Sequence, residues 1–116
     1  MANVVYINEE EGKKRVMNNA KLYAKLLTKF MTDNYDKYLD ELVAFSEAQD
    51  WEKAQGSAHT IKGVAANLSL TELFIQSLDV ETQIKEKSLK PESLENLKAC
   101  FAETLHAVEK VIAQNA

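Results

Sequence analysis

The chain has 116 residues, enough for one hydrophobic core, and we expect residues 1–116 to form a single domain. Hydrophobic residues make up 46 % of it, which excludes a disordered chain. The net charge of −4 argues against a nucleic-acid-binding protein, which is usually basic, so we expect no nucleic-acid partner.

Three features of the sequence favour a cytoplasmic location. The single cysteine, Cys100, cannot form an internal disulfide, which fits a reducing compartment. The opening "MANVVYINEEEG" has too short an apolar run and too many acids for a secretory signal. No apolar run approaches the roughly 18 residues that a membrane span needs, so we expect no membrane partner.

The first part of the chain predicts an arm followed by two helices. "ANVVYI" is the one β-like run, and we expect it to pack on the body as an arm rather than to form a sheet. Asn8 is the expected cap of a short helix with acids in its first turn and bases in its second, which suits the helix dipole. This helix should break at Asn18 and Asn19. A helix over residues 20–32 then has a wide apolar stripe, formed by Leu22, Tyr23, Leu26, Leu27 and Phe30.

Capping residues predict four further helices. Thr32 or Asp33 can cap a helix over residues 34–49, and Asp50 is a good N-cap for residues 51–68. Ser69 opens a capping box with Glu72 and leads into the next helix. The last helix begins near Pro91, which suits a first turn. The expected core residues of these last two helices are Leu73, Ile75, Leu78, Val80, Ile84, Leu94, Leu97, Phe101, Leu105 or Val108, and Ile112.

The short connections between these helices predict the fold class. We expect an all-α protein whose core is an antiparallel, up-down four-helix bundle, with a short additional helix at the N-terminus. One such bundle can bury all its own apolar stripes, so we expect a monomer.

The predicted helix over residues 51–68 carries two neighbouring faces. The bundle-facing stripe has helical steps of four, three, four and three residues and comprises Ala54, Ala58, Ile61, Ala65 and Leu68. His59 lies about 100° round the helix from Ala58. It therefore shares the neighbouring face with Gln55, Lys62, Gly63 and Ala66.

The composition of this second face points to phosphoryl chemistry. Gly63 costs the helix about 1 kcal/mol relative to alanine, and a mid-helix glycine indicates close approach of a backbone or ligand. We expect it to clear space for a partner beside His59; relief of a helix crossing is the alternative. A neutral imidazole can attack a phosphoryl group and hold it as a phosphoramidate. Lys62 can set a positive charge against the phosphate oxygens.

The rest of the sequence contains no second catalytic set. It has no Walker-type loop, no kinase signature and no paired metal ligands. We therefore expect a phosphoryl carrier that is not itself an enzyme, with no cofactor and no metal of its own.

The stretch "AHTIKGVAANLSL" resembles the histidine-containing phosphotransfer (HPt) domain of phosphorelays. The family pattern of histidine, any residue, aliphatic, lysine and glycine is matched from His59 to Gly63. The resemblance implies that His59 accepts a phosphoryl group from a receiver-domain aspartate and passes it to another receiver. It also implies that Lys62 stabilises the phosphoryl group. Where the family has a second glycine, this chain has Ser69.

The resemblance also implies a supporting residue and a docking surface. Glu81 falls where the family often hydrogen-bonds the other nitrogen of the histidine; the alternative is a plain surface acid. The docking surface would include Gln55, Gly63, Val64 and Ala66, with the N-terminal helix at its rim. The expected partners are response-regulator receiver domains and a histidine kinase or hybrid kinase, with Mg²⁺ supplied by the receiver.

Two other functions are compatible with the sequence. The chain could be a phosphoacceptor domain cut from a chemotaxis-type or hybrid histidine kinase. It could also be a helical adaptor that docks receivers without phosphotransfer. The presence of His59, Lys62 and Gly63 together argues against an adaptor.

Overall fold

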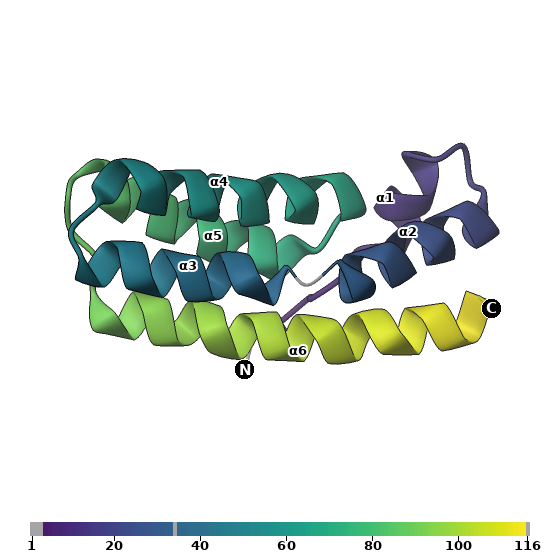
Figure 1. Cartoon of the computed structure of the whole chain (residues 1–116). Helices are drawn as coiled ribbons and strands as arrows, with labels where there is room; N and C mark the ends of the chain where they lie inside the picture. The colour runs from purple at the N-terminus through teal and green to yellow at the C-terminus, as the bar shows by residue number, and fades with distance from the viewer. Residues whose placement is uncertain (1–3, 34, 116) are drawn as a thin grey trace.

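The computed structural model describes residues 4–33 and 35–115 and is all-helical, as the sequence predicts. These residues contain no strand and form the six helices of Figure 1. The helices are α1 (Glu9–Lys14), α2 (Ala20–Thr32), α3 (Asp36–Glu47), α4 (Trp51–Leu68), α5 (Thr71–Lys85) and α6 (Pro91–Asn115). Among the described residues, no helix is long and apolar enough to cross a membrane.

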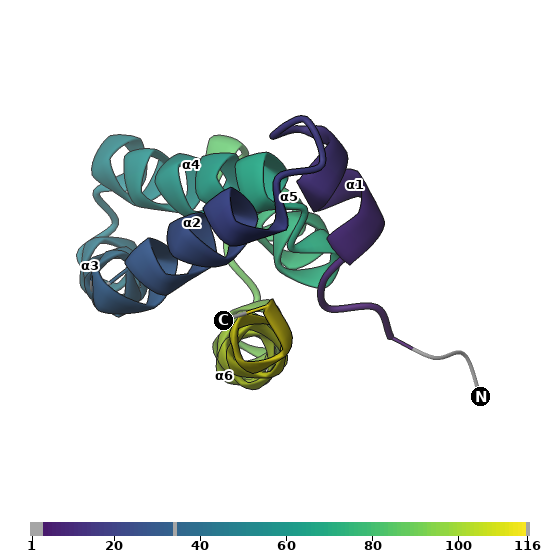
Figure 2. The same cartoon turned by 90° about the vertical axis from the view of Figure 1, so that its right-hand side faces the viewer.

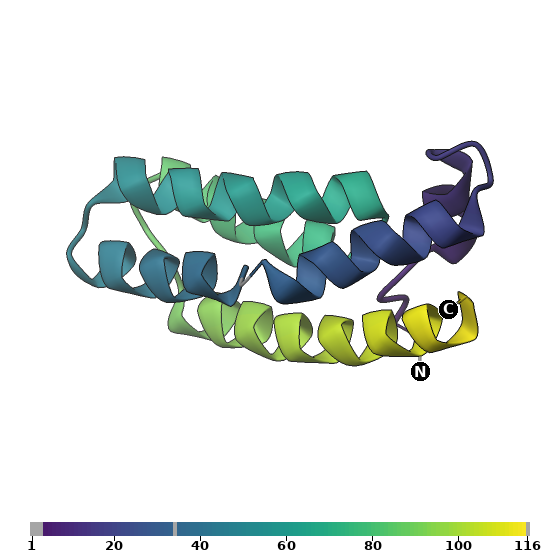
Figure 3. The same cartoon turned by 45° about the vertical axis from the view of Figure 1, so that its right-hand side comes forward.

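The helices pack side by side as a bundle with α4 at one edge. Helix α4 packs against α3 and α5, and α6 packs against α5 and α2. Helices α2 and α3 follow one another along one side of the bundle, and the long α6 runs past both (Figures 1 and 3). In the view of Figure 2, none of the other helices formed by residues 4–33 and 35–115 covers the upper side of α4. One face of α4 therefore stays open along its length.

The buried face of α4 is the stripe that the sequence predicts. Its alanines and isoleucine are fully buried, and Leu68 is almost so. Small side chains let the neighbouring helices approach closely, which fixes the position of α5 beside α4. The predicted core of α6 is also confirmed, since Leu97, Phe101 and Val108 are buried and Leu94, Leu105 and Ile112 pack partly buried against them.

Side-chain caps start three of the helices. The side chains of Asn8, Asn19 and Asp50 each accept a hydrogen bond from the backbone N–H three residues later. The predicted break before α2 is confirmed, because Met17 and Asn18 both have positive φ angles. Helix α6 begins at Pro91, as predicted.

The capping role predicted for Ser69 is wrong. Ser69 ends α4 in the left-handed conformation, with φ 57° and ψ 40°. Its hydroxyl does not cap α5 and instead donates to Glu11 Oε1 at 2.8 Å. The left-handed residue closes α4, because the N–H of Leu70 then reaches the carbonyl of Ala65 at 2.8 Å. A left-handed position favours glycine, which explains why a glycine suits this point of the motif.

The cap predicted for α3 is also wrong. Thr32 is the last residue of α2, where its hydroxyl donates back to the carbonyl of Lys29, and Asp33 is the C-cap. The N-cap of α3 is Tyr35, which makes no side-chain capping bond. Asn34, where this helix was expected to start, lies outside the described residues.

Three leucine and isoleucine side chains predicted as buried lie on the surface. Ile75 and Leu78 of α5 are 49 % and 43 % exposed, and Leu22 of α2 is 40 % exposed. The reason in α5 is register: the helix buries the stripe formed by Leu73, Ser77, Val80 and Ile84, with steps of four, three and four residues. Ile75 and Leu78 lie off that stripe.

The N-terminal segment forms an arm without a strand over residues 4–8. Tyr6 and Ile7 pack against the core, whereas Val4 and Val5 are about half exposed. The N–H of Asn8 donates to the carbonyl of Ser69 at 2.8 Å, which ties the arm to the end of α4. Residues 2 and 3 of the predicted arm lie outside the described residues.

Candidate functional site

His59 projects from the middle of the open face of α4. Its side chain is 68 % exposed, and its Nδ1 lies 3.3 Å from Oε2 of Glu81 on α5. The other ring nitrogen, Nε2, is on the opposite side of the imidazole and so points away from Glu81. A neutral histidine that donates from Nδ1 keeps the Nε2 lone pair free. The geometry therefore presents Nε2 as the accessible nucleophile.

Glu81 is the buried centre of the site. Only 2 % of its side chain is exposed, and its second oxygen, Oε1, lies 2.6 Å from Nζ of Lys62. Burial by itself raises the pKa of this carboxyl. The hydrogen bond and charge of Lys62, with smaller contributions from His59 and Lys85, outweigh burial and leave the pKa of Glu81 below its usual value. Glu81 is therefore a buried anion beside the imidazole and not a plain surface acid.

Lys62 points toward α5 rather than toward solvent. Its side chain is 20 % exposed, and its ammonium group is held by Glu81. The sequence predicts Lys62 on the outward face with His59, because the two residues are close on a helical wheel. Its long side chain reaches the neighbouring helix instead, since an unpaired buried carboxylate would be costly. The ammonium group nevertheless stays within the same cluster as the imidazole.

Gly63 leaves open space on the face that carries His59. A Cβ atom built on Gly63 would meet no other atom within 4 Å, apart from its own helix. No neighbouring helix therefore requires a glycine here, which argues against the helix-crossing alternative. The opening lies one helical turn from His59.

The other residues predicted for the docking surface fall on different sides of α4. Gln55 and Ala66 are half-buried on the same side as Lys62. Ala66 lines an open pocket of about 220 Å³ with Phe74 of α5 and Arg15 beyond α1. Val64 packs against the core and borders a groove toward Lys29 of α2. The structure thus places Ala66 toward α5 and Val64 toward α2.

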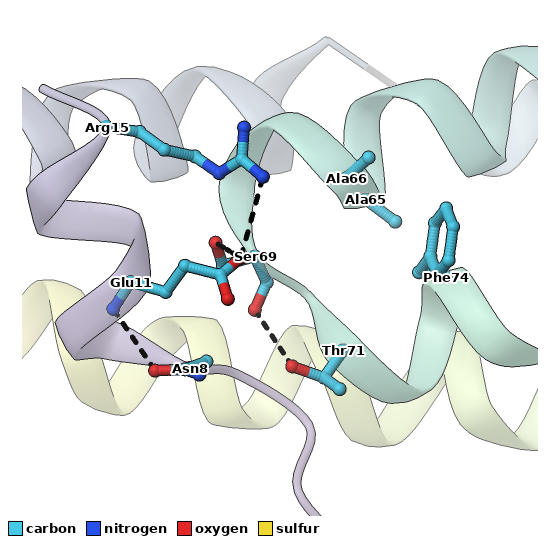
Figure 4. Close-up of a pocket in the computed structure, with 8 residues that line it drawn as sticks. All are labelled: Asn8, Glu11, Arg15, Ala65, Ala66, Ser69, Thr71 and Phe74. Carbon is cyan, nitrogen blue, oxygen red and sulfur yellow. Dashed lines mark hydrogen bonds and ion pairs between the residues drawn. The ribbon is translucent and has the colours of Figure 1, made fainter.

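Helix α1 packs at the Ser69 end of α4, ten residues beyond His59, through contacts that the sequence did not reveal. Figure 4 shows Glu11 between Asn8, Arg15 and the Ser69 hydroxyl. Gly12 lies against the ring of Tyr23, where a Cβ would come within 2.3 Å of the ring. The Tyr23 hydroxyl donates to the carbonyl of Leu68 at 2.7 Å. Glu11, Gly12 and Tyr23 thus join α1 and α2 to the C-terminal end of α4.

Burial makes the Cys100 thiol inactive as a nucleophile. Cys100 is 6 % exposed, and burial raises the pKa of its thiol to about 11, so it is not a thiolate at neutral pH. His106 is exposed on α6. The described residues contain no group of three or more histidine, cysteine, aspartate or glutamate side chains that could hold a metal ion.

Comparison with known proteins places this site in a family. The model of the Hpt domain matches residues 25–111, which is well over half of the chain and includes His59, Lys62, Gly63 and Glu81. The chain therefore belongs to the Hpt domain family. Hpt domains are phosphocarriers of two-component signalling, and they exchange phosphoryl groups with receiver domains and kinases. No curated protein and no solved structure matches the chain.

Proposed function

We propose that this protein is a histidine phosphotransfer protein that accepts a phosphoryl group on His59 from a receiver-domain aspartate and passes it to a second receiver. The observation that carries this proposal is the pairing of His59 Nδ1 with the buried Glu81 carboxylate at 3.3 Å. This pairing leaves Nε2 free and aimed outward on an uncovered helix face. We also propose that residues 1–116 form one cytoplasmic, monomeric domain with an up-down four-helix core.

The transfer step follows from this arrangement. The Nε2 lone pair of His59 attacks the phosphorus of an aspartyl phosphate, forming a P–N bond while the P–O bond to the aspartate breaks. The aspartate leaves as a carboxylate and the imidazole becomes a cation that keeps its proton on Nδ1. Glu81 stabilises that developing positive charge through the Nδ1–H. The reverse step returns the phosphoryl group to a carboxylate by the same path.

Lys62 has two anions within its reach in this scheme. Before transfer it pairs with Glu81 at 2.6 Å. After transfer a phosphoryl group on Nε2 adds further negative charge above the same cluster. A flexible lysine can move between two such acceptors, because it binds as a point charge without fixed orientation. We propose that Lys62 stabilises the phosphoryl group from this position.

The remaining chemistry belongs to the partner. The receiver would supply Mg²⁺ and the phosphorylated aspartate, and this chain would supply the nucleophile, the lysine and a docking surface around Gly63. A histidine kinase or hybrid kinase could also donate the phosphoryl group to His59. The phosphoacceptor domain of a kinase and an adaptor without phosphotransfer are the competing functions.

Labelling the chain from phosphorylated receivers tests the proposal. Incubation with a panel of phosphorylated receiver domains is expected to place acid-labile label on the wild-type chain and none on His59→Gln. His106→Gln, which removes the other histidine, is the matched control and should label normally. Absence of label on the wild-type chain from every receiver and kinase refutes the carrier function. Label that survives His59→Gln refutes the site.

A further inference from the structure

Helices α3 and α6 leave a groove where they run past one another. Helix α3 packs closely against α4, and α6 packs closely against α5 and α2, but α3 and α6 are not among the closely packed pairs. Two hollows lie between them, with volumes of about 330 Å³ and about 240 Å³. Lys98 of α6 lines both hollows, so the two adjoin. We call the pair of hollows the α3–α6 groove.

The floor of the α3–α6 groove is apolar. The larger hollow is lined by Val43 of α3, Trp51 of α4 and Leu94 of α6, and the smaller one by Phe101 and Leu105 of α6. Leu94, Phe101 and Leu105 are separated by seven and four residues, so they form one row along α6. This row is about 16 Å long, which is the length of about three helical turns.

The rims of the groove are acidic. On α3, Asp36 and Glu47 each line one hollow, and Asp40 falls on the same row of the helix. All three are exposed, and within residues 4–33 and 35–115 no lysine or arginine forms an ion pair with them. On α6, the ammonium group of Lys98 is paired with Glu95 at 3.3 Å. The groove therefore carries an excess of negative charge.

The chemistry of the groove selects the class of partner. Helix sides offer no free backbone hydrogen bonds, because the N–H and C=O groups are already paired inside each helix. A segment that lies in the groove must therefore satisfy its own backbone, which a helix does and an extended strand does not. Lys37 of α3 does not neutralise the rim, since its ammonium lies over the ring of Tyr38. Basic side chains at the edges of an incoming helix would therefore complement the acids of both rims.

We propose that the α3–α6 groove binds a basic amphipathic helix of a partner protein. Its apolar face covers the row of Leu94, Phe101 and Leu105, and its basic edges face the rims. Figure 2 shows α6 on the opposite side of the bundle from α4, whose open face carries His59. A helix in the groove therefore leaves Nε2 of His59 accessible and can hold the chain in place while a phosphodonor approaches. This inference does not depend on the proposed function.

A synthetic helix tests the proposal. The probe is an acetylated and amidated peptide of about 15 residues without tryptophan, with leucines at steps of four, three and four residues and lysines beside them. Trp51 is the one tryptophan of the chain and lines the larger hollow, so its fluorescence reports binding, with calorimetry as the second measurement. The same peptide with glutamates in place of the lysines should bind at least about tenfold more weakly. Equal binding of the two peptides, or no binding of the basic peptide up to about 1 mM, contradicts the proposal.

A pair of alanine substitutions on α6 locates the bound helix. Ala102 is exposed and lines the smaller hollow, so Ala102→Gln fills the groove without entering the core and is expected to raise the Kd about tenfold. Ala113→Gln is the control, since this exposed residue falls on the same row of α6 about three turns further on. Its Kd should match that of the wild type. An equal loss in both variants shows that the peptide does not lie in the groove.

A pair of double variants tests the acidic rim. Asp40→Asn with Glu47→Gln is expected to raise the Kd of the basic peptide about fivefold, because two exposed ion pairs are lost. Asp79→Asn with Glu86→Gln removes two exposed acids from α5 and should leave the Kd unchanged. Equal effects of the two double variants mean that the peptide senses only the net charge of the protein, which contradicts a site at this rim.

A small phosphodonor tests whether the groove and the histidine are separate. Phosphoramidate should label the wild-type chain at the same rate with and without saturating peptide. Slower labelling with peptide bound contradicts the separate site but leaves the carrier function standing. A dimer of the wild-type chain that the peptide dissociates assigns the groove to a second copy of this chain and overturns the proposal.

Discussion

Oε1 of Glu81 lies 2.6 Å from Nζ of Lys62, so the carboxylate that faces the phosphoacceptor imidazole is neutralised from its other side. The Glu81 side chain is buried, whereas Lys62 still reaches solvent at its edge. Glu81 therefore depends on Lys62 to remain an anion under α4. The two residues join α4 to α5 at the point where the histidine projects.

Glu81→Gln should destabilise the fold by about 1–3 kcal/mol, because it removes the charge that Lys62 pairs with. Lys62 can turn partly toward water, which keeps the loss below that of a fully buried pair. Urea denaturation measures the change. Glu109→Gln on the exposed surface of α6 is the control and should stay within about 0.5 kcal/mol of the wild type. Equal stability in both variants would mean that the pair does not stabilise the fold.

The free energy of unfolding of the wild type should decrease as the pH is lowered, and this decrease should be smaller in Glu81→Gln. The pKa of Glu81 is lowered in the folded state from a reference value of 4.5. A lowered pKa contributes stability above 4.5, and this stability is lost as the pH falls through the folded value, because the unfolded chain binds the proton first. Urea midpoints of the two proteins should therefore converge at acidic pH. A constant difference down to pH 2 contradicts the assignment.

Substitutions at Gly63 should separate folding from transfer. Gly63→Ala and Gly63→Gln are expected to raise the free energy of unfolding by up to about 1 kcal/mol, because no atom lies where the new side chain begins. Gly63→Gln should slow transfer from a receiver much more than Gly63→Ala, since only the longer side chain fills the opening. Phosphoramidate labelling is the control and should be unchanged. Wild-type transfer rates in Gly63→Gln would count against a partner-facing role.

Gly12→Ala should have the opposite effect on stability. Its Cβ would lie 2.3 Å from the ring of Tyr23, whose hydroxyl is held by the carbonyl of Leu68. Overpacking of this kind costs about 1–3 kcal/mol. Thermal unfolding measures the loss, and Gly56→Ala, where a Cβ has no neighbour within 4 Å, is the matched control. If Gly12→Ala is as stable as Gly56→Ala, α1 does not pack as described.

Ser69 offers a test of the turn that ends α4. Ser69→Ala keeps the left-handed backbone and loses the hydrogen bond to Glu11, so it should destabilise the fold by about 1 kcal/mol. Ser69→Gly loses the same bond but relieves a left-handed strain of about 1 kcal/mol, so it should be near neutral. Urea denaturation of the pair measures the difference. A glycine variant no more stable than the alanine variant contradicts this balance.

The sequence by itself determined the features that depend on neighbours along the chain. The buried stripe from Ala54 to Leu68 follows from spacings of three or four residues. The caps at Asn8 and Asp50 and the break before α2 follow from residue types that stand next to one another in the chain. The same is true of the His59 to Gly63 motif, whose residues share one helix. Such patterns are readable because a helix repeats every 3.6 residues, whatever it packs against.

The tertiary structure decided what depends on the register between helices. It placed Glu81 beside His59, turned Lys62 toward α5, and left Ile75 and Leu78 exposed. It also brought Ser69 close to Glu11, far away in the sequence, so that the Ser69 hydroxyl donates a hydrogen bond to Glu11. Local spacing cannot fix these contacts, because they depend on how far α5 and α1 slide and rotate against α4. That register is set by side-chain packing in the core.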